Sequence, residues 1–375
     1  MKAAAVVVGL FLLFGGFTVR AETVEELYNE QLEASGAEEL IAALPEETQA
    51  LLEKLGLNTL EPVDLEAPHT ETVLKQLISL AAEALRGPLS TAGMVLATVL
   101  LYAWVEGMRQ TLRSEETSAV FGTVCALAVC GSLLLPLTAC VKAVGEAMAS
   151  VGVFMASFVP VYAGVLLSSG HSATALSFQS VVLYVSQLLS WLAGGVITPL
   201  LTIALALGVT GSVTPHVRLG GAGKLIGKTA VWILTLGMLL FTGLLSLQSF
   251  TGAAADNVGV RVMKFSIASF VPVVGGSLSE MFSTVRGCLQ LLKTALGGFG
   301  AAASALIVLP PLLRCFGWQL LLAVCRMATD LFELRVMSEI LEAAHGTVKS
   351  LIGILCACGA FLIIAVTVVS TAIGG

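Results

Sequence analysis

Long apolar segments constrain the fold of this chain most strongly, and the longest runs from 173 to 215 without an Asp, Glu, Lys, Arg or His residue. About 20 consecutive apolar residues are enough for an α-helix to cross a membrane. Charged residues make up only 12% of the chain, whereas they make up about 25% of a typical soluble domain. The pattern therefore predicts a protein whose surface largely faces lipid.

The segments predict an all-α polytopic membrane protein with about seven to nine transmembrane helices. The segment 173–215 is too long for one span at a rise of ~1.5 Å per residue, and Gly194-Gly195 and Pro199 could divide it into two. The apolar segments lie at 88–107, 117–141, 148–169, 173–215, 229–250, 265–279, 296–325 and 350–372.

Two apolar stretches occur twice with the same spacing. ASFVPV is found at 156–161 and at 268–273, and VITPLL at 196–201 resembles VLPPLL at 308–313, so both pairs are 112 residues apart. We interpret 117–228 and 229–340 as two copies of one membrane unit, an internal repeat of ~112 residues. Whether the copies are parallel or inverted depends on an odd or even number of spans per unit.

Prolines and glycines interrupt the predicted helices at matching places. Because proline lacks an N–H and clashes with the preceding turn, we expect a kink or a break at Pro160 and Pro272. Interrupted helices at corresponding positions of two repeats point to a transport pathway, and kinked packing helices are the alternative. The candidate pore or kink residues are Pro160, Gly164, Pro199, Pro272, Gly275, Gly276 and Pro311.

Three charged residues lie next to the second ASFVPV. Lys264 and Glu280 bracket this short apolar segment, and Arg286 follows. They are candidate boundary charges that line an opening, although long side chains at such positions also snorkel to water without a further role.

The N-terminal region differs from the rest. Residues 1–21 have the plan of a signal peptide, with Lys2, an apolar core and a small-residue cleavage site, and an uncleaved anchor is the alternative. Of the 25 acidic residues, 14 lie between Glu22 and Glu71. We predict an acidic extracytoplasmic helical segment at 22–70, with one helix starting near Pro45. An interfacial helix and the first span follow at 71–116, and a C-terminal span lies in 341–375.

Basic loops suggest the orientation. If the acidic segment is exported, the first span places Arg109 and Arg113 in the cytoplasm, and the next spans return Arg218, Lys224 and Lys228 to the same side. The Gly227-Lys228-Thr229 sequence resembles the end of a phosphate-binding loop, but Ala222 stands where that motif needs glycine. We expect a basic loop near anionic headgroups instead.

Nothing in the sequence predicts an enzyme, a cofactor, a metal site or a nucleic-acid surface. The four histidines have no ligand spacing, and no catalytic Ser/His/Asp set or HExxH motif is present. The eight cysteines lie in or beside apolar segments, where we interpret them as apolar fillers. Residues 329–345 are predicted to form an amphipathic helix, with Leu331, Leu334, Ile340 and Leu341 facing the membrane or a partner.

The stretch VRVMKFSIASFVPVVGGSLSEMFSTV, followed by LLKTALGGFG, resembles the signature of the stage III sporulation protein AE family of endospore-forming Firmicutes. The overall plan of signal peptide, acidic head and many spans is also similar. The resemblance implies a multi-pass subunit in the mother-cell membrane around the forespore. Its implied partners are the other stage III sporulation membrane proteins of one channel or feeding-tube complex.

Two other functions stay open. One is a stand-alone secondary transporter of a small solute, and the other is a non-conducting membrane scaffold. Homo-oligomerisation also stays open. No catalytic residue is implied by the resemblance.

Overall fold

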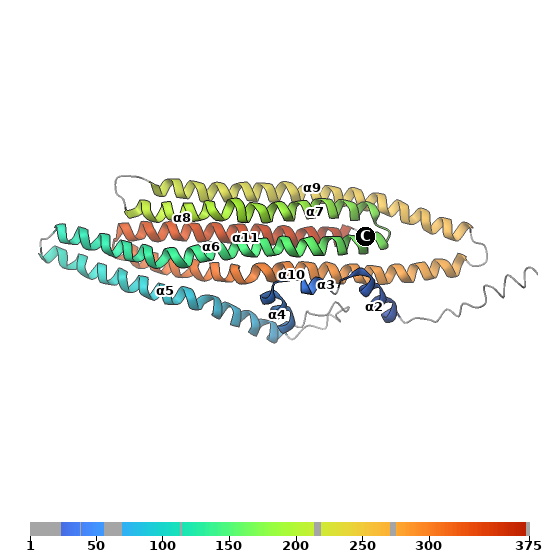
Figure 1. The fold of residues 1–375 in the computed structure, drawn as a ribbon, viewed down its shortest axis with the longest axis horizontal. Helices are drawn as coiled ribbons and strands as arrows, with labels where there is room; N and C mark the ends of the chain where they lie inside the picture. Colours follow the sequence, from blue (N-terminus) through green and yellow to red (C-terminus); the bar gives the residue numbers. More distant parts are fainter. Residues whose placement is uncertain are drawn as a thin grey trace, which may run out of the picture.

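The computed structural model describes residues 24–37, 39–55, 70–112, 115–213, 219–270 and 275–372. Every regular element in these ranges is a helix (Figure 1), so the all-α prediction is confirmed. The helices are α2 (Val24–Ser35), α3 (Glu39–Ala42), α4 (Glu46–Lys54), α5 (Thr70–Leu112), α6 (Glu115–Ser168), α7 (Ser172–Leu192), the π-helix η1 (Ala193–Ile197), α8 (Thr198–Val213), α9 (Leu219–Phe270), α10 (Gly275–Leu331) and α11 (Arg335–Ala372).

The long helices run up and down along one elongated bundle (Figure 1). α7, η1 and α8 lie in line and act as one rod. α6, α10 and α11 pack against one another, with α5 against α6 and α10, and α9 against α7, α8 and α11. Among the described residues, six helical stretches are long and apolar enough to cross a membrane. The chain is thus a multi-pass membrane protein.

Two predicted interruptions are wrong, because helices continue where we expected a loop and a reversal. The segments 117–141 and 148–169 both belong to α6, and the interfacial helix expected to lead into the first span continues into it as α5. The segment 173–215 does not reverse, since η1 joins α7 to α8 without a turn. No residue with a left-handed backbone separates the apolar runs within these helices. In α6 the bridging residues include the helix formers Lys142 and Glu146, whereas Gly194 and Gly195 bridge α7 and α8 as a π-helix.

The helices are longer than one membrane crossing requires. α6 has 54 residues, which corresponds to about 80 Å and exceeds twice the ~30 Å of a hydrocarbon core. At its middle, Lys142 and Glu146 form an ion pair of 3.4 Å, and their side chains are 77% and 66% exposed. The number of helices therefore does not fix the number of crossings.

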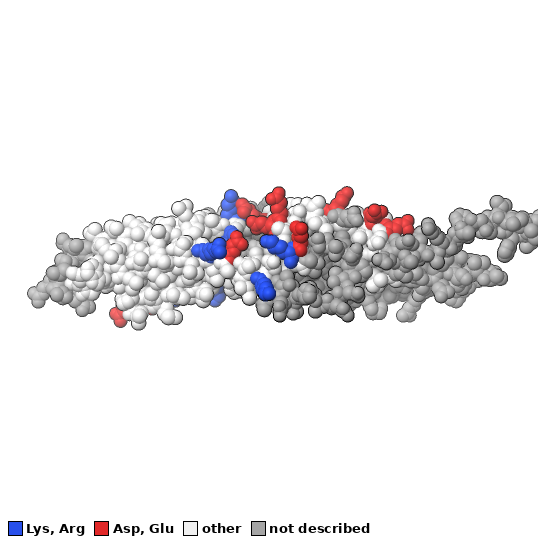
Figure 2. Space-filling model, turned by 90° about the horizontal axis from the view of Figure 1, so that it is seen from below, with Lys and Arg blue, Asp and Glu red and all other residues white. Residues whose placement is uncertain are grey.

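Charged side chains of the described residues gather over one region of the face seen in Figure 2. They lie mainly over the middle of that face, where α4 and the start of α5 lie in Figure 1. Because charges are costly in hydrocarbon, this region contacts water or lipid headgroups rather than the acyl chains.

Two turns end their helices in the same way. At the end of α6, His171 N–H bonds to Leu166 O (3.0 Å) and Gly170 N–H to Leu167 O (2.9 Å), with Gly170 at φ +84°. At the end of α10, Leu334 N–H bonds to Thr329 O (2.9 Å), and Glu333 is at φ +55°. Both are Schellman-type ends with a left-handed residue.

The second turn corrects the helix predicted at 329–345. The chain reverses between Leu331 and Arg335, so these residues divide between α10 and α11. Leu334, Ile340 and Leu341 are buried in the bundle, whereas Leu331 is exposed. Most of the apolar face predicted for a membrane or a partner therefore packs within the chain itself.

The acidic N-terminal helices lie beside the bundle. α2 and α4 contact α10, and Tyr28, Leu40 and Leu52 are buried there. α4 begins after Pro45, as the sequence predicted. The signal-peptide prediction for 1–21 falls outside the described residues. The ends of α5 and α8 lie at the same end of the bundle (Figure 1), which agrees with placing both basic loops on one side.

Candidate functional site

The predicted kink residues of the first copy lie on the outside of the bundle. α6 continues through Pro160 to Ser168, and Pro160 and Gly164 are both exposed. The helix therefore does not break at Pro160, while the alternative of a kink there stays a prediction. Pro199 is the second residue of α8, directly after η1.

The second copy lies in a different setting. Its residues 268–270 end α9, and Pro272 falls at 271–274, outside the described residues. Gly275 and Gly276 begin α10, and Pro311 is half-buried within the same helix. The side chains of Lys264, Glu280 and Arg286 also lie outside the described part. The repeat and the role of these residues remain predictions.

The π-turn has a local cause. Gly194 and Gly195 permit the wider turn, and Thr198 Oγ1 donates a hydrogen bond of 2.8 Å to Ala193 O. A Cβ at Gly145 of α6 would lie 2.6 Å from Thr198 Oγ1, so glycine is needed for α6 to approach here. π-turns are frequent at functional sites, but the contacts seen at this one are helix packing.

Aromatic side chains fill the interior between α6, α7 and α10. Phe158 stacks on Phe154 and Tyr162 with ring centroids 5.6 and 5.4 Å apart, and Tyr162 meets Phe178 at 5.2 Å. A Cβ at Gly300 of α10 would collide with the ring of Phe158. At this level the space between the three helices is occupied by packed rings.

The sequence analysis did not single out a buried lysine in α10. Lys293 of α10 is 0% exposed, and an ionisable residue inside a membrane bundle is commonly functional. The signal was present, because Lys293 follows the apolar LQLL and precedes TALGGF.

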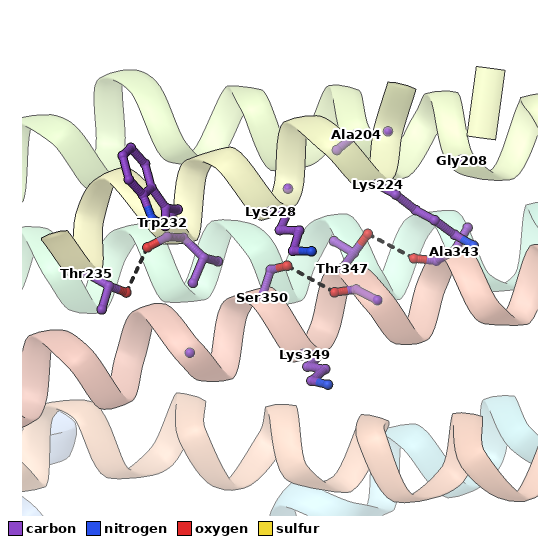
Figure 3. A pocket seen from close by; sticks show the side chains of 15 residues that line it. Ala204, Gly208, Lys224, Lys228, Trp232, Thr235, Ala343, Thr347, Lys349 and Ser350 are labelled. Atoms are coloured by element: carbon purple, nitrogen blue, oxygen red, sulfur yellow. Dashed lines mark hydrogen bonds between the residues drawn. The ribbon is translucent and has the colours of Figure 1, made fainter. Parts of the chain in front are cut away.

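A groove of about 590 Å³ lies between α9 and α11, and Ala204 and Gly208 of α8 also line it (Figure 3). Small residues create the space, because Gly223 and Gly227 of α9 face α8 and α11, and Gly346 and Gly353 lie on α11. A Cβ at Gly223 would be 2.6 Å from Ala204 O, so α9 and α8 touch backbone to backbone at one end of the groove.

Three lysines line the groove. Lys224 donates a hydrogen bond of 2.7 Å to Glu342 Oε1, which ties α9 to α11. Lys228 and Lys349 take part in none of the ion pairs of the described residues. Lys228 extends toward Thr347 and Ser350 (Figure 3). The sequence predicted Lys224 and Lys228 in a basic loop, which is wrong, because α9 already begins at Leu219 and contains both lysines. The contribution of α11 could not be read from the sequence.

The described residues contain neither a group suited to hold a metal ion nor a disulfide. No group of three or more His, Cys, Asp or Glu side chains there could hold a metal ion. All eight cysteines are free, and Cys140 Sγ of α6 lies 3.4 Å from Cys315 Sγ of α10. What the arrangement offers chemically is a cationic groove beside an apolar surface.

The fold and this surface define a multi-pass, all-helical membrane protein. The sequence model of the family described as Stage III sporulation protein AE matches residues 65–373. This range contains every long helix, from α5 to α11. The chain therefore belongs to the Stage III sporulation protein AE family.

A curated relative gives the same family name. The chain is similar to Stage III sporulation protein AE of Bacillus subtilis (strain 168), with 25% identity over 169 residues. The match covers 45% of this chain and 42% of the relative, so it spans less than half of either protein. No solved structure matches the chain.

Proposed function

We propose that the protein is an integral membrane subunit of the channel complex that joins the mother cell to the forespore, and that forespore development requires it. The observation that carries this proposal is the family match over 65–373, which coincides with the membrane bundle from α5 to α11. The residues that place the chain in the family are therefore those of the membrane bundle. In this role the protein acts without catalysis of its own.

The location follows from the same proposal. The protein lies in the mother-cell membrane around the forespore, with the acidic helices α2 to α4 outside the cytoplasm. Its partners are the other stage III sporulation membrane proteins. The acidic side chains of α2 and α4, most of them exposed, offer a surface for basic partners in the space between the two membranes.

Complementation tests this role. In an endospore-forming host that lacks its own family member, expression of this chain should restore heat-resistant spores and late gene expression in the forespore. A matched strain expressing residues 1–69 alone should remain defective, because the bundle is missing. If full-length protein accumulates in the membrane, co-purifies with no other sporulation membrane protein, and leaves spore formation unchanged, the proposal is wrong.

Reconstitution distinguishes the transporter alternative. A subunit of a larger channel should give little solute uptake when the purified protein alone is placed in lipid vesicles. Saturable uptake of a small solute by the protein alone would identify a stand-alone carrier.

A further inference from the structure

We propose that the groove between α9 and α11 binds one anionic phospholipid, with the phosphate among Lys224, Lys228 and Lys349 and the acyl chains along the outer face of α9. This inference does not depend on the proposed channel role. It rests on the charge of the groove, on its shape, and on the surface that continues from it.

The charge of the groove suits a phosphate. Lys224 is bonded to Glu342, but Lys228 and Lys349 enter no ion pair of the described residues, so the lining keeps an excess of positive charge. Thr347 Oγ1 and Ser350 Oγ donate to backbone oxygens of their own helix at 3.1 Å. Either hydroxyl can rotate to donate to a phosphate oxygen instead.

The shape allows a headgroup to enter between the helices. Gly227 has Ser350 Oγ 3.5 Å from its Cβ position, and Gly353 has Val231 Cγ1 at the same distance. A larger side chain at either glycine would fill the gap that separates α9 from α11. The volume of about 590 Å³ accommodates a phosphate and the glycerol attached to it.

The surface next to the lysines selects a lipid over a soluble anion. Trp232 lines the groove one turn after Lys228 and is 64% exposed. Tryptophan at the end of an apolar surface is typical of the membrane interface. The face of α9 that continues from Trp232 exposes a series of large apolar side chains, namely Ile233, Leu236, Leu239, Leu240, Leu244 and Leu247. A cationic end followed by an apolar stripe matches a headgroup followed by its chains.

Native mass spectrometry of the detergent-purified full chain tests the site. The protein is presented with equimolar dioleoyl phosphatidylglycerol and dioleoyl phosphatidylcholine, and the bound lipid is identified by mass. We expect a preference for phosphatidylglycerol on the order of tenfold, because each lysine near a phosphate contributes to binding. The Lys228→Gln/Lys349→Gln variant should lose this preference.

Two further variants separate the groove from general surface charge. Lys142→Gln removes an exposed lysine from α6 and should leave the preference unchanged. Gly227→Leu keeps every lysine but fills the groove, and it should reduce phosphatidylglycerol binding as much as the lysine variant does. If the Lys228→Gln/Lys349→Gln variant retains the preference of the wild type, the proposal is wrong.

Competition with inorganic phosphate shows whether the groove binds the phosphate of a lipid or a free phosphate ion. At a concentration equal to that of the lipid, inorganic phosphate should not displace bound phosphatidylglycerol, because it lacks acyl chains to contact α9. Displacement under these conditions would show a site for free anions and overturn the lipid assignment.

Discussion

The Asp256 carboxylate of α9 accepts hydrogen bonds from the backbone N–H groups of Ala173 (2.9 Å) and Thr174 (3.0 Å), at the start of α7. The residue before α7, His171, makes no side-chain capping bond. A carboxylate from another helix therefore caps α7 and satisfies N–H groups that its own turn leaves free. Gly252, one turn earlier in α9, permits this approach, since its Cβ position lies 3.0 Å from Thr174 Oγ1.

Replacing Asp256 should destabilise the bundle. Asp256→Ala removes the acceptor while Thr174 stays buried, so we expect the free energy of unfolding to fall by about 2 kcal/mol. Denaturant titration of the purified protein in detergent measures the change. Glu146→Ala is the matched control, because Glu146 is an exposed acid on α6 and should change stability by less than about 1 kcal/mol. Equal stability of Asp256→Ala and wild type would contradict the capping role.

Packing at Gly300 gives a second prediction. A methyl group at this position would collide with the Phe158 ring. Gly300→Ala should therefore destabilise the protein by about 1–3 kcal/mol, as overpacked cores do. Adding Phe158→Leu should recover part of that loss by removing the ring atoms in conflict. If the double variant loses more free energy of unfolding than the two single variants lose together, α6 and α10 do not meet at these residues.

The exposed ion pair in α6 predicts a membrane boundary there. In a variant without native cysteines, Glu146→Cys should react with a charged, membrane-impermeant maleimide, because this part of α6 contacts water or headgroups. Val153→Cys is the control. Val153 lies two turns further along the same helix, in an apolar stretch, and its side chain is 62% exposed. Val153→Cys should stay unlabelled in intact membranes. Equal labelling at both positions would mean that α6 does not meet a boundary between them.

The predicted pore prolines can be tested without unfolding the protein. Pro160 is exposed in the middle of a continuous helix, and alanine is favoured over proline there, so Pro160→Ala should not lower stability. Under the channel proposal, Pro160→Ala combined with Pro272→Ala should still enter the complex but give far fewer heat-resistant spores. Pro136→Ala, at another proline inside α6, is the control. Normal sporulation in the double variant would show that these prolines are not part of the functional site.

The sequence predicts the helices better than it predicts where they end. Apolar runs with little charge identify each long helix, because lipid leaves the backbone no alternative to helical hydrogen bonds. The charged residues Lys142 and Glu146 lie between the predicted segments 117–141 and 148–169, yet both favour helices and α6 continues through them. The turn at Glu333 was missed for the opposite reason, since a glutamate occupies a left-handed position that glycine usually marks.

The candidate groove shows a second limit of prediction from the sequence. Lys224 and Lys228 stand out in the sequence as a basic segment beside an apolar run. Lys349 and Glu342 are more than a hundred residues away, and only the packing of α9 on α11 brings them to the same place. Pairing between distant helices is set by packing of small residues such as Gly223 and Gly208, which no local pattern reveals.

Oxidative cross-linking of Cys140 to Cys315 tests the bundle most directly, because α6 and α10 are packed so that these thiols lie 3.4 Å apart. The other six cysteines are replaced by alanine, and a protease site is inserted at 214–218. After treatment with copper–phenanthroline and cleavage, the two fragments should stay joined until a reductant is added. A control chain that keeps Cys140 and Cys325 should separate into two fragments. Free fragments from the Cys140/Cys315 chain, or equal cross-linking in the control, would contradict the packing of α6 against α10 at the centre of the bundle.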